Sequence, residues 1–172
     1  LPTREVGLEK YISAMQDSGN QLRKDFGSTY LIEKAIETIH TERKKLGGFK
    51  NGHIVPKRIS YIIDSVKNID EIELLRSVYG ESLILIGVFA PDSIRNKRLK
   101  ISENKKQSFV EILKRDQGEE ASFGQKTRKV FVLSDYFLCN DSDLYRLREK
   151  VGRFVELLFD INVHTPTRDE AA

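Results

Sequence analysis

The sequence of 172 residues predicts an α/β domain with a parallel sheet, because two buried apolar runs flank a well-marked helix. Residues 59–63 form a continuous apolar run of β-forming residues, and residues 82–90, SLILIGVFA, form a stronger one. Continuous apolar runs are typical of strands that are covered on both faces. A strand, a helix and a strand within about 35 residues make a βαβ unit, whose strands are parallel and whose crossover is right-handed.

The helix between the two runs is indicated by its start signal. Asn68 is a favoured N-cap residue, and Glu71 lies three positions further on, where it completes a capping box. The apolar residues Ile72, Leu75 and Val78 then define the face that we expect to be buried.

The segment before the first strand predicts a pair of helices. Apolar residues recur at helical spacing from Leu8 to Phe26 and again from Leu31 to Ile39. A break of the first helix near Gly19 is an open alternative, and the second helix is expected to stop at KKLGG. The stretch FKNGHIVPK, with its Asn-Gly pair and proline, indicates a surface loop.

The second half of the chain alternates charged and apolar stretches. Residues 93–120 read as an exposed, charged helical excursion with sparse apolar positions. Residues 129–140, KVFVLSDYFLCN, supply short apolar segments that Asp135 interrupts and Asn140 ends. An apolar stripe from Leu144 to Leu158 predicts a packed closing helix.

Composition limits the class of protein. Charged residues make up 32% and hydrophobic residues 39%, which is ordinary for a folded, soluble domain. No apolar run approaches the roughly 20 residues that span a bilayer and no signal-peptide core is found, so we expect a cytoplasmic protein without a membrane partner. The net charge of +3 does not demand a polyanionic partner. The single cysteine, Cys139, is expected at a half-buried strand position.

Asp64 is the first candidate for a ligand-binding residue. It follows the run 59–63, and ligands of open α/β sheets bind outside the carboxyl ends of the strands. An acid at that place can hold Mg²⁺, directly or through water, because this hard cation prefers oxygen ligands. An ordinary turn or helix N-terminus acid is the competing interpretation.

A basic cluster after the second strand is the next candidate. Arg95, Lys97, Arg98 and Lys100 stand where a phosphate would need positive partners, and Arg115 follows further on. A solvated helix face is the alternative explanation, and a nucleic-acid role lacks the interleaved aromatic residues that stack on bases.

Two signatures are missing from the sequence. It contains no G-x-x-x-x-G-K-[ST] motif, and its scattered histidines and single cysteine do not make a zinc set. No complete catalytic centre can therefore be read from these residues. The three histidines are His40, His53 and His164.

Four stretches together resemble the N-terminal P-loop kinase-like domain of the bacterial anti-phage deoxycytidylate (dCTP/dCMP) deaminases, which join it to a C-terminal zinc deaminase domain. The resemblance implies a three-layer P-loop NTPase or nucleotide-kinase-like fold over residues 1–163, with residues 164–172 starting a linker. It also implies that the first strand, the P-loop and the deaminase domain are absent from this chain. The stretches are MQDSGNQLRKDFG (15–27), YIIDSVKNIDEIELLRSVYGESLILIGVFAP (61–91), KRDQGEEASFGQKTRKVFVLSDYFLCN (114–140) and HTPTRDE (164–170).

The resemblance also implies roles for individual residues. The nucleotide and Mg²⁺ site would use the acid Asp64 with its neighbours Lys67 and Asn68, and the lid-type arginines Arg95 and Arg98. The remaining motif residues have no settled role, and for the last two a structural hydrogen bond is as well supported as a ligand contact. These residues are Arg23, Arg115, Asp116, Glu119, Gln125, Asp135 and Asn140.

The function implied by the resemblance is control of an antiviral hydrolase. The chain would be the nucleotide-binding regulatory domain of a deaminase that depletes dCTP and dCMP during phage infection. Zn²⁺ would belong to the missing deaminase domain, and an NTP with Mg²⁺ to the full-length protein. The implied partners are deoxycytidine nucleotides, the chain's own deaminase domain, further copies in a homo-oligomer, and a small regulatory RNA on the basic stretch 95–106.

Two other functions fit the residues themselves. The predicted βαβ unit, with Asp64 and the basic helix, is compatible with a deoxynucleoside or nucleotide kinase. A module that binds RNA or protein is the third hypothesis, and its binding would be sensitive to salt.

Overall fold

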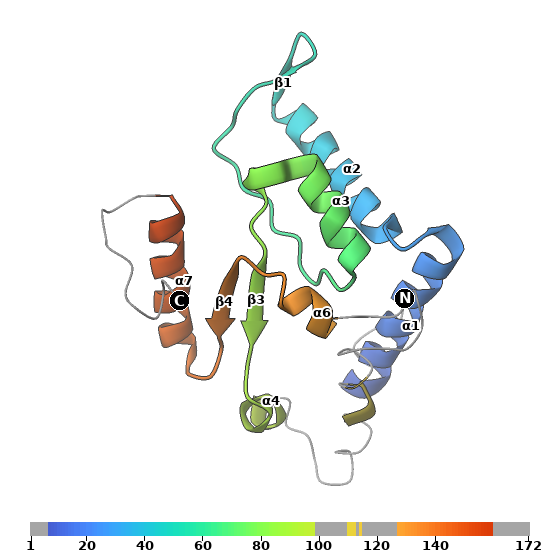
Figure 1. The fold of residues 1–172 in the computed structure, drawn as a ribbon, viewed down its shortest axis with the longest axis vertical. Coiled ribbons are helices and arrows are strands. Elements are labelled where there is room, and N and C mark those ends of the chain that lie inside the picture. The colour runs from blue at the N-terminus through green and yellow to red at the C-terminus, as the bar shows by residue number, and fades with distance from the viewer. Residues whose placement is uncertain (1–6, 99–109, 113, 115–126, 160–172) are drawn as a thin grey trace. The chain divides into compact units, whose positions relative to one another are not determined.

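The computed structural model describes residues 7–98, 110–112, 114 and 127–159. The chain divides into two compact units (Figure 1). Unit 1 consists of Leu1–Ile84 with Ser102–Leu133, and unit 2 of Leu85–Ile101 with Ser134–Ala172.

Unit 1 opens with the two predicted helices. Helix α1 (Leu8–Phe26) is continuous, so the alternative of a break near Gly19 is wrong. It ends at Gly27, whose φ of 109° suits a residue without Cβ. Helix α2 (Tyr30–Lys45) follows after a short turn and ends within the predicted KKLGG stop signal, with Leu46 as its C-cap.

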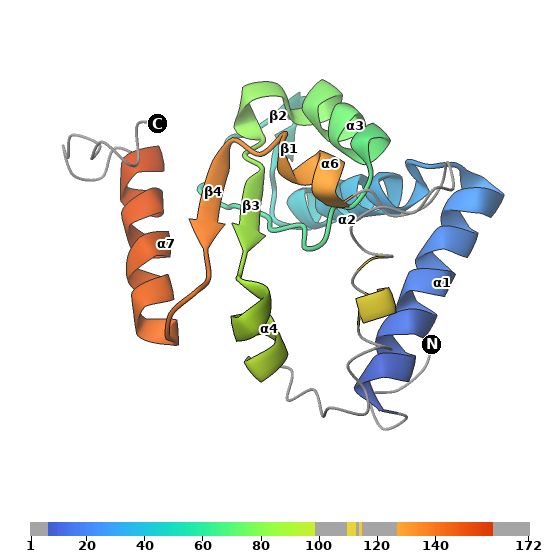
Figure 2. The ribbon, with the colours of Figure 1, turned by 60° about the horizontal axis from the view of Figure 1, so that its bottom comes forward.

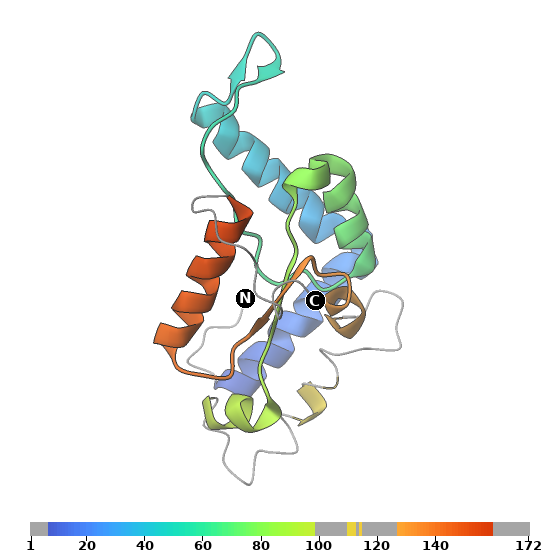
Figure 3. The same cartoon turned by 60° about the vertical axis from the view of Figure 1, so that its left-hand side comes forward.

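A small hairpin replaces the predicted loop after α2. Strands β1 (Phe49–Lys50) and β2 (His53–Ile54) pair antiparallel, with Phe49 opposite Ile54 and Lys50 opposite His53. The two turn residues Asn51 and Gly52 have φ values of 52° and 79°, which is the reason an Asn-Gly pair is favoured in a two-residue hairpin turn. The hairpin projects beyond the end of α2 (Figure 3).

Helix α3 (Ile69–Tyr79) starts at the predicted capping box and continues into a short 3₁₀ turn, η2 (Gly80–Ser82). It contacts α2 and the short helix α6 (Thr127–Phe131). Val78 is 48% exposed, contrary to prediction, because positions three apart drift by about 60° per step around a helix. The buried apolar residues in the described part of this unit are Ile32, Ile72, Leu75 and Val130.

The prediction of a strand at residues 59–63 is wrong. Residues 59–63 belong to an irregular segment, and in the described part of the chain they pair with no strand. The side chain of Ile62 is 93% exposed. A strand exists only where a neighbour accepts its backbone hydrogen bonds, and no apolar run can supply that neighbour by itself. The predicted βαβ unit with residues 82–90 is therefore not formed.

Unit 2 contains the parallel sheet, with a different partner for the second predicted strand. Strand β3 (Ile86–Phe89) pairs with β4 (Tyr136–Cys139) in parallel, in a register that sets Ile86 beside Tyr136 and Phe89 beside Cys139. Helix α4 (Asp92–Arg98) follows β3, and α7 (Leu144–Leu158) follows β4.

The predicted closing helix α7 packs on the sheet through one aromatic contact. The rings of Tyr136 and Phe154 lie 4.2 Å apart, and Figure 2 shows α7 beside β4. Phe154 and Leu138 are buried apolar residues of unit 2, while Leu144 at the start of the helix is 63% exposed. The helix is confirmed, and its apolar stripe is buried only in part.

Two glycines give a test of these local conformations. Gly152 lies inside α7, and a Cβ added there would meet no atom within 4 Å. Gly152→Ala should therefore raise the free energy of unfolding by about 0.5–1 kcal/mol, because alanine is the better helix former.

At Gly48 a Cβ would lie 2.8 Å from the carbonyl oxygen of Arg43. Gly48→Ala should lower stability by about 1–3 kcal/mol, since backbone must shift.

Both effects are measurable by urea unfolding followed by circular dichroism. A loss of stability in Gly152→Ala would contradict the placement of α7.

Candidate functional site

The carboxyl ends of β3 and β4 carry a connected cluster of polar side chains in unit 2. Arg98, at the end of α4, donates from Nη1 to the backbone oxygen of Asn140 at 2.9 Å and to its Oδ1 at 2.8 Å. Its Nη2 donates to the backbone oxygen of Ser142. The backbone N–H of Asn140 in turn donates to the carbonyl of Phe89 at 2.7 Å. Arg98 therefore ties the end of β4 to the helix that follows β3.

An ion pair lies beside this point. Lys150 of α7 donates from Nζ to the carbonyl oxygen of Cys139 at 2.9 Å and to Oδ1 of Asp141 at 3.1 Å. The hydrogen bond from Lys150, with a further one from the Cys139 thiol, holds the pKa of Asp141 below its ordinary value of 3.8. Partial burial, followed by the hydrogen bond with Asp141, raises the pKa of Cys139. The thiol is half-buried in β4 as predicted, which disfavours the reactive thiolate.

We call Arg98, Asn140, Asp141, Ser142 and Lys150 the strand-end cluster. It lies where open α/β sheets bind their ligands. The two predicted residues Arg98 and Asn140 are brought together here, and the charged pair Asp141–Lys150 was not singled out in the sequence. No local pattern predicts this pair, because Lys150 lies in the following helix, 9 positions after Asp141.

The other predicted residues of unit 2 have local roles. The Oδ2 of Asp135 accepts a hydrogen bond from the backbone N–H of Leu85 at 2.7 Å, and its own N–H donates to the carbonyl of Leu85 at 2.8 Å. Asp135 thus joins the two strands at their amino ends, away from the strand-end cluster. Arg95 lies on α4, with Nη1 3.6 Å from Oδ1 of Asp92 one turn earlier.

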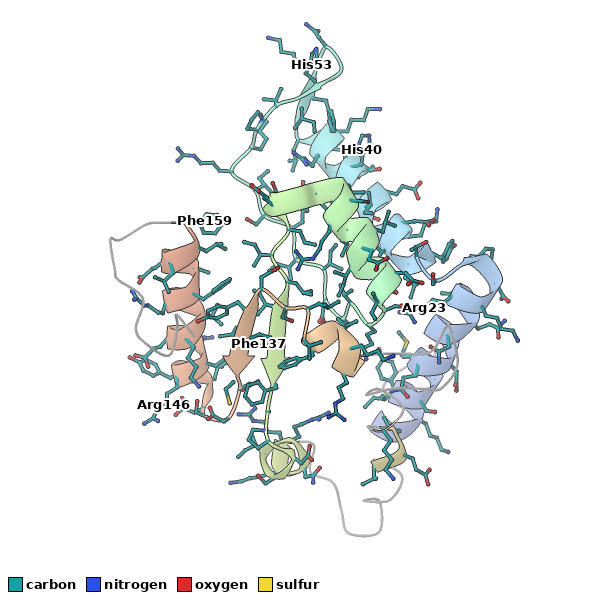
Figure 4. The ribbon with its side chains drawn as sticks, in the orientation of Figure 1. Arg23, His40, His53, Phe137, Arg146 and Phe159 are labelled. Atoms are coloured by element: carbon teal, nitrogen blue, oxygen red, sulfur yellow. The ribbon has the colours of Figure 1, made fainter. Side chains whose placement is uncertain are left out.

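Unit 1 holds a buried ion pair. Nε of Arg23 in α1 lies 2.8 Å from Oε1 of Glu71 in α3, and these side chains are 4% and 1% exposed. The other carboxylate oxygen, Oε2, accepts the backbone N–H groups of Lys67 at 2.9 Å and Asn68 at 3.1 Å. Figure 4 labels Arg23 on α1. The capping acid predicted at position 71 is therefore also the counter-ion of the motif residue Arg23.

Asn68 is buried as the helix cap. Its Oδ1 accepts from the N–H of Asp70 at 3.3 Å, while its Nδ2 has no hydrogen-bond partner among the described residues. Gln16 of α1 is also buried, and its Nε2 donates to the carbonyl of Ile112 at 3.3 Å. Lys67 and Asn68, which were predicted to bind a ligand, therefore take part in hydrogen bonds that begin α3.

Asp64 does not stand at the end of a sheet strand. Its side chain is exposed, and Oδ1 accepts a hydrogen bond from the hydroxyl of Ser65 at 3.1 Å. Ser65 has a φ of 72°, a conformation that favours glycine. Asp64 was a candidate because it was predicted to follow a sheet strand. That prediction is wrong, because residues 59–63 do not form a strand. The motif residues Arg115, Asp116, Glu119 and Gln125 lie outside the described residues.

Metal-binding side chains are not gathered in the part of the chain that the structure describes. No group of three or more His, Cys, Asp or Glu side chains there could hold a metal ion. A zinc set does not fit these residues, whereas Mg²⁺ needs fewer protein ligands. Across the same residues, no helix is long and apolar enough to cross a membrane.

Comparisons with known proteins find archaeal relatives of one kind. A UPF0200 protein of Thermococcus onnurineus is 26% identical over 157 residues, which cover 90% of this chain and 77% of that protein. One from Thermococcus sibiricus is 26% identical over 155 residues, or 88% and 74% of the two chains. One from Saccharolobus solfataricus is 22% identical over 138 residues, or 79% of this chain.

The match spans 64% of the Saccharolobus protein, so this chain corresponds to less than two thirds of that relative's length. No family model and no solved structure matches the chain. The chain is thus similar to UPF0200 proteins, and the fold that the structure shows is mixed α/β with a small parallel sheet.

The buried ion pair yields a stability prediction. Arg23→Met should lower the free energy of unfolding by about 3–5 kcal/mol, because Glu71 is left buried without its counter-ion. Adding Glu71→Gln should recover part of this loss, since a neutral amide oxygen can still accept the N–H groups of Lys67 and Asn68. Urea unfolding of the single and double variants measures both effects, and a cost below about 1 kcal/mol for Arg23→Met would contradict the burial of the pair.

The pair Asp141–Lys150 yields a pH prediction. The folded-state pKa of Asp141 lies below 3.8, so its contribution to stability is present above the unfolded-state pKa and is lost as the pH falls through the folded-state value. Lys150→Met should move the pKa of Asp141 upward toward 3.8, because it removes the largest stabilising hydrogen bond of the carboxylate. Titration of the side-chain carboxyl by NMR measures this pKa, with Lys129→Met as the control that should leave it unchanged.

Proposed function

We propose that this chain is part of a nucleotide-binding domain of the kinase-like type, whose strand-end cluster holds a phosphate group. The observation that carries the proposal is the fixed position of Arg98 at the carboxyl ends of two parallel strands. The similarity to UPF0200 proteins and the resemblance to P-loop kinase-like domains support the same class of fold.

Arg98 is suited to bind phosphate because its orientation is set in advance. A guanidinium has five N–H donors. Three of those of Arg98 are used, two on Nη1 for Asn140 and one on Nη2 for Ser142. Two donors are left for a ligand, as far as the described residues show. An arginine that is already held loses less side-chain entropy when it binds an anion, and its planar fork matches phosphate oxygens.

Neighbouring charges strengthen the phosphate site. Arg95 and Lys97 lie on the same short helix as Arg98, so α4 carries three cations and one acid, Asp92, which lies 3.6 Å from Arg95. The opposing carboxylate, Asp141, is neutralised by Lys150. The strand-end cluster is therefore expected to favour a multiply charged anion such as the phosphate chain of a nucleotide.

Mg²⁺ would be supplied with the nucleotide in this proposal. Mg²⁺ is commonly held by one or two carboxylates together with water and the phosphates of the nucleotide. When bound, the ion neutralises phosphate charge.

A narrower form of the proposal makes the domain the regulatory part of an antiviral deoxycytidine nucleotide deaminase. It rests on the motif resemblance alone, and its zinc chemistry would have to come from residues beyond this chain. A deoxynucleoside or nucleotide kinase is the alternative with the same phosphate site. The two forms share the binding step and differ in the reaction that follows it.

The binding step is tested on the longest natural chain that contains these residues. Isothermal titration with ATP, dCTP and dCMP in the presence of Mg²⁺ should show binding that Arg98→Ala weakens by about tenfold or more, the loss of one charge-assisted phosphate contact. Arg148→Ala on the exposed face of α7 removes the same charge from the same unit and is the matched control. Equal affinities in the two variants would refute the phosphate site.

The reaction is then read from the products. Uracil nucleotides formed from dCTP or dCMP, with a nucleotide response that Arg98→Ala alters, support the regulatory deaminase. Transfer of phosphate from ATP to a deoxynucleoside or its monophosphate supports the kinase. Binding without either product leaves the sensing function and rejects both reactions for that protein.

A further inference from the structure

The hairpin β1–β2 and the segments on either side of it form a strongly basic region of unit 1. Residues 40–58 contain six lysines and arginines and one acid, Glu42, a local net charge of +5, whereas the whole chain carries +3. The remainder of the chain is therefore net negative. We call this region the basic hairpin surface, and its cations are Arg43, Lys44, Lys45, Lys50, Lys57 and Arg58.

The fold gathers cations from both sides of the hairpin. The N–H of Gly48 donates to the carbonyl of Arg43 at 2.8 Å, and the N–H of Val55 donates to the carbonyl of Gly48 at 2.7 Å. These bonds return the chain to the end of α2, where Arg43 and Lys57 line the same small pocket. Cations that are 14 positions apart in sequence numbering are thus brought to one place.

These cations are largely free to meet an anion. Lys45 pairs with Glu42 at 2.6 Å, but among the described residues no carboxylate pairs with the other five. All of the six except Arg43 are exposed. Unpaired cations that gather on one face raise the local potential and attract a polyanion.

Aromatic rings are interleaved with these charges. The ring of His40 lies 4.9 Å from that of Phe49, and Figure 4 labels His40 on α2 and His53 in the hairpin. Tyr61 lines the pocket beside Arg43 and Lys57, and its enclosed hydroxyl has no hydrogen-bond partner in the described part of the chain.

We infer that the basic hairpin surface binds single-stranded nucleic acid. Lysines and arginines that track a backbone, together with rings on which bases stack, are the combination that holds single strands without sequence readout. The helix α4, where the basic stretch 95–106 was expected to bind RNA, is less suited to that role. Its Arg98 is engaged by Asn140 and Ser142, and its Arg95 lies beside Asp92.

The test measures the salt dependence of binding by the full natural chain. Fluorescence anisotropy with a labelled 20-mer of dT should show affinity that falls linearly with salt on a double-logarithmic plot, with about 0.7 of slope for each phosphate contact. The variant Lys44→Gln/Lys50→Gln/Lys57→Gln should lower the slope by about 2 and weaken binding about tenfold or more in low salt. None of these three side chains makes a hydrogen bond to a described residue, so the fold should be retained, as circular dichroism will show.

A matched control removes the same charge elsewhere. Lys10→Gln/Lys24→Gln/Lys129→Gln changes three exposed lysines of α1 and α6 and should leave both slope and affinity near the parent values. Equal loss in the two triple variants, or no binding of the 20-mer, would overturn the inference. So would tighter binding of a duplex of equal length, of polyglutamate, or of phosphatidylserine vesicles at equal charge concentration.

This inference is independent of the phosphate site of the strand-end cluster. Arg98→Ala should leave binding of the 20-mer unchanged, and the triple lysine variant should leave binding of dCTP unchanged. Loss of both activities in Arg98→Ala would assign the nucleic acid to α4 and overturn the role of the hairpin.

Discussion

The carboxylate of Glu71 is the constraint on which unit 1 depends. It is 1% exposed, and an ionised carboxyl in such a place is tolerated only if its oxygens are paired. Oε1 meets the guanidinium of Arg23, and Oε2 meets the two backbone N–H groups that begin α3. Helix α1 is therefore joined to the start of α3, and the apolar residues of α3 are directed toward α2 and α6 as a result.

This arrangement explains why some of unit 1 is predictable from local sequence. The capping box and the end of α1 at Gly27 each depend on a few neighbouring residues, and both are found, whereas the Asn-Gly pair expected in a surface loop forms a hairpin turn. The ion pair joins residues 48 positions apart, and no local pattern announces such a partner. The prediction of a strand at 59–63 is wrong for a related reason. The composition of that segment suits a strand, but a strand also needs a second segment with which to pair.

In the strand-end cluster, too, single residues were predicted from the sequence and their long-range contacts were not. Arg98 and Asn140 are found individually from their places after apolar runs, but their hydrogen bond spans 42 positions. The parallel sheet is predicted as a class, yet β3 takes β4 as its partner and not the segment before α3. Asp135 is tied to Leu85 by backbone and side chain, as the structural interpretation of that acid requires.

The two basic regions differ in a way that separates their ligands. In the strand-end cluster the guanidinium of Arg98 is fixed by Asn140 and Ser142, so its remaining donors have a set direction. A fixed fork discriminates by geometry and suits a small anion with a defined shape. The hairpin presents exposed lysines, which are flexible, strongly hydrated point charges, beside aromatic rings. Such a surface gains affinity from counterion release and stacking, and both terms grow with the length of a polyanion. The two proposals therefore assign different ligands to the two units, a nucleotide phosphate to unit 2 and an extended strand to the hairpin of unit 1.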